Sequence, residues 1–276
     1  MRTSCLTLLL AAALGALLLP GCSSTTSAGA VGADRRQLLL VSSEQLNQTA
    51  ARQYSQLTAK AAQQGVLDQD PAQTARVKRI AARLIPQTTV FRPDARNWNW
   101  QVHTLSSKEV NAWCMPGGKI AVYTGLIQKI NPTDDELAAV MGHEIAHALR
   151  EHSRERVSQQ VASSAVVGIG AAALGLGRAG ADLGSALATV TYGLPNSREH
   201  EREADRIGVE LAARAGYDPR AAISLWQKMA AAGGSGTPEL LSTHPAPASR
   251  IEDLKVYATK VMPLYEQANK GAAPGN

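Results

Sequence analysis

Cysteine is scarce in this sequence of 276 residues, which limits how the fold can be held together. The three cysteines are Cys5, Cys22 and Cys114. Cys5 lies in a leader-like apolar stretch and Cys22 at its end, so removal of that stretch and modification of Cys22 would leave Cys114 without a partner. We therefore expect no intramolecular disulfide. No cluster of cysteine and histidine indicates a structural zinc site.

Aromatic residues and blocks of like charge are also few. Aromatic side chains make up 4% of the sequence, and the net charge of +5 is spread along the chain. Arginines gather at residues 76–83 and 150–156, both within predicted helices, which favours solvated helix faces over a dedicated binding surface. We find no nucleic-acid motif and expect no nucleic-acid partner.

The sequence lacks the run of about 20 apolar residues that a membrane-spanning helix needs. Leu6–Leu19, after the positive Met1-Arg2, has the length of a signal peptide instead. It ends at Leu19-Pro20-Gly21-Cys22, which resembles a bacterial lipobox, where the cysteine is lipidated and becomes the first residue. Ser24 resembles the outer-membrane sorting pattern. The alternative is an ordinary cleaved signal with a chance cysteine.

These features divide the chain into four predicted parts. Residues 1–21 are a lipoprotein signal peptide, and the polar residues 22–41 are a flexible tether. Residues 42–262 are long enough for one domain with a substantial core. Residues 263–276 are a C-terminal tail.

Residues 143–147 read His-Glu-Ile-Ala-His, a pattern that predicts a metal site. Residues four apart lie on the same face of an α-helix, so His143 and His147 can point two imidazoles at one tetrahedral ion. Glu144 lies about 100° round the helix, where it is no ligand but can act as a general base on a water at the metal. The alternative is a chance occurrence on an amphipathic helix.

The helix that carries this motif has a clear predicted start. Asn131-Pro132 breaks the chain, and Thr133 can cap the helix with Glu136 as its capping-box partner three residues later. Acidic residues at 134–136 favour a helix start because they face the positive end of the helix dipole.

A later helix offers a third ligand. The stretch after Asp205 has helical spacing, and when the helix is extended back to Ser197, Glu201 and Asp205 fall on its apolar face. A carboxylate there is costly unless it is paired or metal-bound, so Glu201 is the predicted third ligand. Asp205 is predicted to hydrogen-bond a ligand histidine. We expect the other charged residues here to face solvent: Glu199, Arg202, Glu203 and Arg206.

The rest of the pattern is mainly helical with a few strands. Helical spacing covers residues 42–64 and 72–85, and alternation at 98–105 predicts a strand. A turn at 116–118 precedes a second strand at 119–124. We expect a small antiparallel sheet beside the metal helix, whose edge can bind an extended peptide by strand addition. The alternative is a hairpin in the core without a binding role.

Four motifs occur in one order: NAWCMPGGKIAVYTGL, HEIAH, SREHEREADRIG and STHPAPASRIEDL. Over roughly residues 45–260 they resemble the family-48 metallopeptidases, the group that holds the CAAX prenyl endopeptidases, and the lipoprotein signal is more similar to the periplasmic branch of that family. The resemblance implies an α+β, mainly α-helical, zincin-like metallopeptidase with a small sheet and one Zn²⁺ ion. In the family's E-x-x-x-D pattern the glutamate binds zinc, which matches Glu201.

These observations predict a zinc endopeptidase. His143, His147 and Glu201 would hold the ion, and Glu144 would take a proton from the water in the fourth position and return it to the leaving amine. The resemblance implies misfolded or misassembled envelope proteins as substrates at the periplasmic face of the outer membrane, with the outer-membrane assembly machinery as a further partner. The alternative is a membrane-tethered, mostly latent, chaperone-like binding protein that retains the zinc site.

Two features of the sequence have more than one interpretation. Residues 161–177 are uncharged and contain four glycines, so the segment 161–190 is compatible with an apolar helical hairpin, an active-site lid or a membrane-surface contact. His244, before Pro245, matches a family histidine near the metal. It could occupy the open zinc position or stabilise an oxyanion, and Arg250 is assigned to the catalytic group with it.

Overall fold

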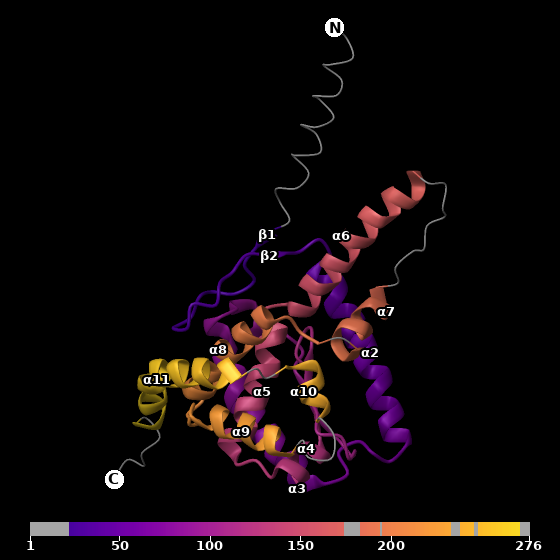
Figure 1. Ribbon diagram of the computed structural model, residues 1–276. Helices are drawn as coiled ribbons and strands as arrows, with labels where there is room; N and C mark the ends of the chain where they lie inside the picture. Colours follow the sequence, from indigo (N-terminus) through magenta and orange to yellow (C-terminus); the bar gives the residue numbers. More distant parts are fainter. Residues whose placement is uncertain (1–21, 174–182, 194, 233–237, 246–247, 271–276) are drawn as a thin grey trace.

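The computed structural model describes residues 22–173, 183–193, 195–232, 238–245 and 248–270. Helices dominate and a small sheet lies among them (Figure 1), which confirms the predicted mainly helical α+β fold. The helices are α2 Ser43–Gln63, α3 Pro71–Leu84, α4 Thr124–Ile130, α5 Asp134–Leu149, α6 His152–Ala173, α7 Leu183–Ala188, α8 Arg198–Arg214, α9 Ala221–Ala231, α10 Glu239–Thr243 and α11 Ala248–Lys270. Short helical turns are η1 Ile85–Val90, η2 Pro93–Asn97 and η3 Thr189–Gly193. The strands are β1 Cys22–Ser23, β2 Gln37–Leu38, β3 Gln101–Leu105, β4 Ala112–Met115 and β5 Lys119–Tyr123.

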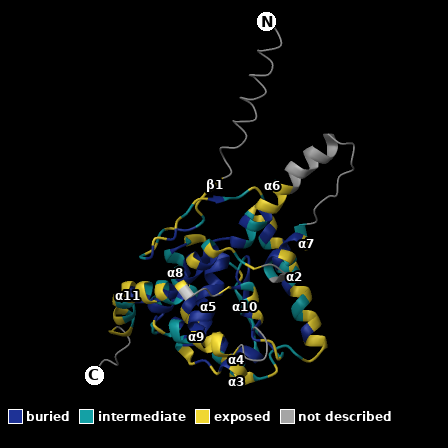
Figure 2. Cartoon of the chain, in the orientation of Figure 1, coloured by how far each residue is buried: buried dark blue, intermediate teal, exposed yellow. Residues whose placement is uncertain are grey.

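Helix α5 forms the centre of the fold. Every residue from Glu136 to Leu149 is buried, so the helix is dark blue along its length in Figure 2. Its start is the predicted capping box: Thr133 Oγ1 accepts from the Glu136 N–H (3.2 Å), and the Glu136 carboxylate accepts from the Thr133 N–H (2.8 Å). A helix buried on all sides must be apolar nearly all round, which makes the histidines and the glutamate of its last turns exceptional.

Helix α8 packs against α5 through two glycines. The helix begins at Arg198, next to the predicted start at Ser197, and Ser197 is its N-cap. A Cβ added to Gly208 would lie 2.8 Å from the backbone nitrogen of His143, and one added to Gly142 would lie 2.9 Å from the Gly208 carbonyl oxygen. Because neither residue has a side chain, the two helix backbones approach until they touch.

The three-stranded sheet has the order β3-β5-β4. β4 and β5 are antiparallel across the predicted turn at 116–118, whereas β3 runs parallel to β5. The predicted antiparallel pairing is therefore found in the β4–β5 hairpin. β3 lies on the other side of β5 from β4 and runs parallel to β5. β3 starts at Gln101, so Trp98 and Trp100 precede the strand that was predicted to contain them.

The N-terminal segment, which we define as residues 22–41, packs against the helices. Val31 and Ala33 are 2% and 1% exposed, and the Val31 N–H donates to the carboxylate of Glu210 (3.1 Å). β1 pairs with β2 within the segment. The segment is therefore packed in this structure, a feature that its polar composition did not indicate, because composition does not reveal contacts with distant residues.

Helix α11 continues past the predicted domain end at residue 262 to Lys270. Pro263 lies inside the helix and cannot donate a backbone hydrogen bond. Leu264 and Tyr265 pack against the core directly after it, which offsets that loss. The predicted tail therefore begins with helix, and residues 271–276 lie outside the described residues.

The glycine- and alanine-rich segment is helical where it is described. α6 extends to Ala173, and α7 packs against α2 through Leu187, which is fully buried. Residues 174–182 of the segment lie outside the described residues. In the described ranges, no helix has both the length and the apolar character needed to cross a bilayer. The hairpin, the lid and the surface contact all stay predictions.

The glycine contact between α5 and α8 generates a prediction. Gly208→Ala places a Cβ against the backbone of α5, and overpacking of this kind costs about 1–3 kcal/mol. We expect the unfolding temperature to fall by several degrees, as measured by circular dichroism. Arg202→Ala, a change at an exposed position of the same helix, is the matched control. An unchanged unfolding temperature for Gly208→Ala would show that the helices have room to separate.

Candidate metal centre

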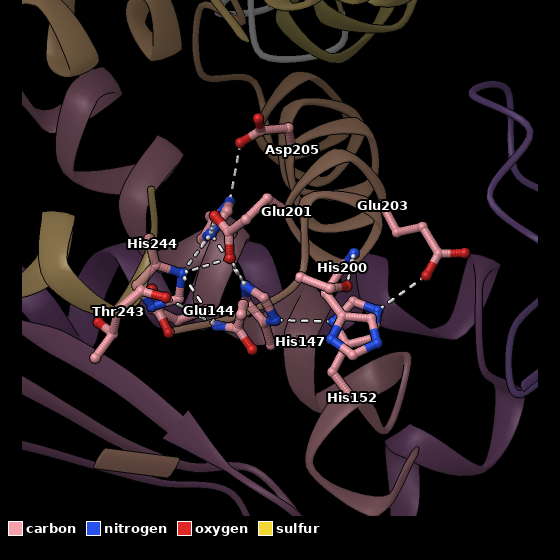
Figure 3. Close-up of polar contacts among 12 residues, drawn as sticks. Glu144, His147, His152, His200, Glu201, Glu203, Asp205, Thr243 and His244 are labelled. Atoms are coloured by element: carbon pink, nitrogen blue, oxygen red, sulfur yellow. Dashed lines mark hydrogen bonds and ion pairs between the residues drawn. The ribbon is translucent and has the colours of Figure 1, made fainter. Parts of the chain in front are cut away.

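Four side chains converge between α5, α8 and the end of α10. His143 and His147 lie one turn apart on α5, Glu201 lies near the start of α8, and His244 directly follows α10. One nitrogen or oxygen from each of the four lies within 4.8 Å of all the others, and all four residues are buried. Figure 3 shows His147, Glu201 and His244 pointing toward a common centre.

The separations are those expected between ligands of one metal ion. His143 Nε2 lies 3.1 Å from His147 Nε2, and each of these nitrogens lies 3.4 Å from an oxygen of Glu201. Ligands bound about 2.1 Å from a tetrahedral ion are about 3.4 Å apart. His244 Nδ1 lies 2.9 Å from Glu201 and 3.2 Å from His143, and so completes a set of four donors. The residues present therefore fit a metal ion.

The protonation of the donors also suits a cation. Burial lowers the pKa of His147 well below its usual value, which leaves the ring neutral. Burial by itself would raise the pKa of Glu201, but His244 and His143 hold it well below the usual range. Burial would likewise lower the pKa of His143, but Glu201 and Asp205 outweigh it and raise the pKa to about 9. The negative charge of Glu201 and Asp205, which stabilises a proton on His143, can stabilise a bound metal cation instead.

Asp205 and Arg250 lie on the outer side of His143. Asp205 Oδ1 is 3.0 Å from His143 Nδ1, the nitrogen that faces away from the cluster centre. Arg250 on α11 donates two hydrogen bonds of 2.7 Å to Asp205, approaches Glu201 to 3.0 Å and lies 3.4 Å above the ring of Trp226. The structure thus places Asp205 against a cluster histidine, where the sequence analysis expected it, and Arg250 against both carboxylates.

Glu144 lies beside the four donors without joining them. It is 4% exposed, and its Oε1 lies 3.5 Å from His244 Nε2. Among the described residues, that oxygen has no hydrogen-bond partner. Burial raises the pKa of Glu144, and the neighbouring histidines oppose this effect. A buried carboxylate oxygen without a partner is well placed to accept a proton.

Glu203 contradicts the expectation of a solvated face on α8. Its carboxylate is 2% exposed and accepts from Arg150 (2.7 Å) and from His152 (3.0 Å). The side chains of Glu199 and Arg202 are 45% and 50% exposed, in agreement with the expected solvent contact. The error arises because α8 is covered by the N-terminal segment as well as by α5 and α11, and helical spacing alone identifies only one apolar face.

Further polar residues around Glu203 were not predicted from the sequence. Arg35 is half-buried, and four are buried: Arg150, His152, Glu155 and His200. His152 follows His147 by five residues, a spacing that does not place two side chains together on one helix. The chain bends between α5 and α6 at Glu151, whose φ is +50°, and this bend returns His152 to His147. The one signal of this contact in the sequence is a histidine just past the end of the HEIAH helix.

Comparison with known proteins places the cluster in a family. The model for peptidase family M48 matches residues 71–258. The mitochondrial metalloendopeptidase OMA1 of Arabidopsis thaliana is 37% identical over 148 residues, 54% of this chain and 29% of that protein. OMA1 of Schizosaccharomyces pombe is 38% identical over 162 residues (56% and 46%), and the beta-barrel assembly-enhancing protease of Escherichia coli K12 is 27% identical over 210 residues (73% and 42%). The chain spans less than half of each of these relatives.

The matched region runs from α3 into α11 and contains all four donors, Glu144 and Arg250. It thus includes the sheet, the packed pair α5 and α8, and the whole cluster. This chain belongs to peptidase family M48.

Proposed function

We propose that this protein is a zinc-dependent endopeptidase anchored to the outer membrane at its periplasmic face. The observation that carries the proposal is the convergence of His143, His147 and Glu201 in the core, with the carboxylate of Glu144 beside them. Membership of peptidase family M48 supports the reaction class.

The residues divide the chemistry between them. His143, His147 and Glu201 hold one Zn²⁺ ion, and Asp205 and Arg250 orient His143 and Glu201. When bound, the ion supplies a Lewis acid that polarises the scissile carbonyl and lowers the pKa of a water toward ~7. Glu144 accepts the proton of the attacking water and delivers it to the leaving amine. Its raised pKa suits a group that must both take up and release a proton.

Glu144→Gln tests this function. The amide keeps the shape of the side chain but cannot accept the proton, so cleavage of unfolded casein should fall at least 10²-fold. Zinc content should stay at the wild-type level, because Glu144 is no ligand. Wild-type cleavage by the variant would exclude Glu144 as the base.

The sheet suggests how a substrate lies across the cluster. β4 is an edge strand in the order β3-β5-β4, and an extended peptide can pair with such an edge. A pocket connects this hairpin with α10 and is lined by Leu57, Glu109, Asn111, Trp113, Tyr123, Thr191, Glu239 and Thr243. Thr243, on the wall of this pocket, directly precedes His244 in the chain.

Misfolded or misassembled envelope proteins are the substrates that we propose, and the outer-membrane assembly machinery is a further partner. The similarity to a protein named beta-barrel assembly-enhancing protease supports this class. A mostly latent, chaperone-like binding protein that retains the zinc site is the second candidate. The intact Glu144 speaks against it, because a protein that only binds needs no base.

His244 offers a test of latency. Its Nδ1 lies among the donors, so in this position it would occupy the site that water needs. His244→Ala should therefore raise the cleavage of unfolded casein. A loss of ~10²–10³ in kcat would instead identify His244 as an oxyanion donor. A change below about twofold at unchanged zinc content would exclude both roles.

The membrane anchor depends on Cys22, which is exposed and free. If the sequence Leu19-Pro20-Gly21-Cys22 is a lipobox, Cys22→Ser prevents lipidation. The variant should move from the membrane fraction to the soluble periplasmic fraction after cell fractionation. Continued membrane retention would show that a different feature, for example the apolar run that begins at Val161, attaches the protein.

A further inference from the structure

A second buried polar cluster lies on the outer side of His147. His152 Nδ1 is 2.8 Å from His147 Nδ1, and His152 Nε2 is 3.0 Å from Glu203. His152 and Glu203 are 1% and 2% exposed. His200 stacks on the His152 ring with centroids 4.3 Å apart. None of these three residues takes part in the proposed catalytic mechanism.

The hydrogen bonds of this cluster have only one direction when His147 binds a metal. His147 Nε2 faces the donors, so it must be free of a proton, and the neutral ring then carries its proton on Nδ1. Two Nδ1 atoms 2.8 Å apart share a single proton, so His147 donates and His152 accepts. His152 then carries its own proton on Nε2 and donates it to Glu203.

Glu203 is held in turn by two arginines. Arg150, which is fully buried, donates to one carboxylate oxygen at 2.7 Å. Arg35, from the N-terminal segment, donates to the other at 3.1 Å and bridges to Glu155 at 2.8 Å. Two cationic and two anionic side chains thus lie together with matching charge, and the Glu203 carboxylate accepts from Arg150, Arg35 and His152.

The N-terminal segment completes this cluster. Arg150 donates to the hydroxyls of Ser24 and Thr26 at 3.1 Å each and to the backbone carbonyl of Arg35 at 2.9 Å. The side-chain amide of Gln37 donates to the Arg150 carbonyl oxygen at 2.6 Å. The segment therefore covers the cluster and satisfies groups that water would otherwise reach.

We propose that His152 and Glu203 are positioning residues that fix the tautomer and the orientation of His147, and that Arg35 makes the N-terminal segment part of the metal centre. The inference rests on the zinc site proposed above. Partners of this kind raise metal affinity because they keep the ligand ring oriented and basic. The segment that follows Cys22 is thereby linked to the metal.

Zinc affinity of the full chain, measured by competition with a chelator, tests the proposal without reference to proteolysis. Glu203→Gln should weaken zinc binding about 10–100-fold. Glu199→Gln, the same change at a position of α8 whose side chain is 45% exposed, should leave it unchanged. Arg35→Gln should weaken binding in the same direction as Glu203→Gln.

Substitutions of His152 separate positioning from packing. His152→Asn keeps an acceptor near the position of Nδ1, whereas His152→Phe keeps a ring of similar shape without an acceptor. Asn should retain more zinc affinity than Phe. Where the Phe variant does not fold, the comparison of Glu203→Gln with Glu199→Gln still decides.

Hydrogen exchange tests the link to the N-terminal segment. Because coupling between two sites is reciprocal, zinc should slow exchange of the hydrogen-bonded amides of Ser27 and Ala33, and Glu203→Gln should abolish the slowing. A wild-type chain that binds no zinc would refute the proposed function. A different result would overturn this inference and leave the proposed function intact. In that case the wild-type chain binds zinc, the Glu203 and Arg35 variants bind it within twofold of the wild-type affinity, and zinc does not slow the exchange.

Discussion

The close approach of α5 and α8 at Gly142 and Gly208 is the constraint on which the metal centre depends. Without side chains at this contact, the backbones of the two helices touch, and residues on either side are brought within ligand distance. The pairs that meet are His143 with Asp205, His147 with Glu201, and His152 with Glu203. From His143 to His147 the residue numbers rise along α5 while those of their partners, Asp205 and Glu201, fall along α8, so the two helices run antiparallel. His152, beyond the bend at Glu151, meets Glu203, which lies between these two partners in sequence.

This arrangement explains how so many charges are stable in the core. A lone buried carboxylate costs several kcal/mol, but each one here has cationic or imidazole partners. Glu201 and Asp205 share Arg250 and His143, while Glu203 and Glu155 share Arg35. The charges thus form two balanced groups, one on each buried side of α8.

The sequence predicted the structural features that depend on residues close together in the chain. The capping box at Thr133, the start of α8 near Ser197 and the apolar face that carries Glu201 all depend on residues three or four apart, which one helix fixes by itself. The burial of Glu203 depends on Arg35, which is distant in sequence, and no helical pattern contains that information. The same reason explains why the N-terminal segment was expected to be a tether, because its polar residues pair with groups that only the folded chain supplies.

The four donors differ in how they are held, and this difference bears on control of the site. His143, His147 and Glu201 belong to two long helices whose contact is fixed by backbone, and each is held by polar partners outside the donor set. His244 lies after the five-residue helix α10, where its N–H bonds the Leu240 carbonyl and the neighbouring Thr243 carbonyl accepts from Asn196. A displacement of His244 would thus leave three donors in place, which is the number that a catalytic zinc site uses when its fourth position is open. Metal retention and access to the metal are therefore properties of different parts of this fold.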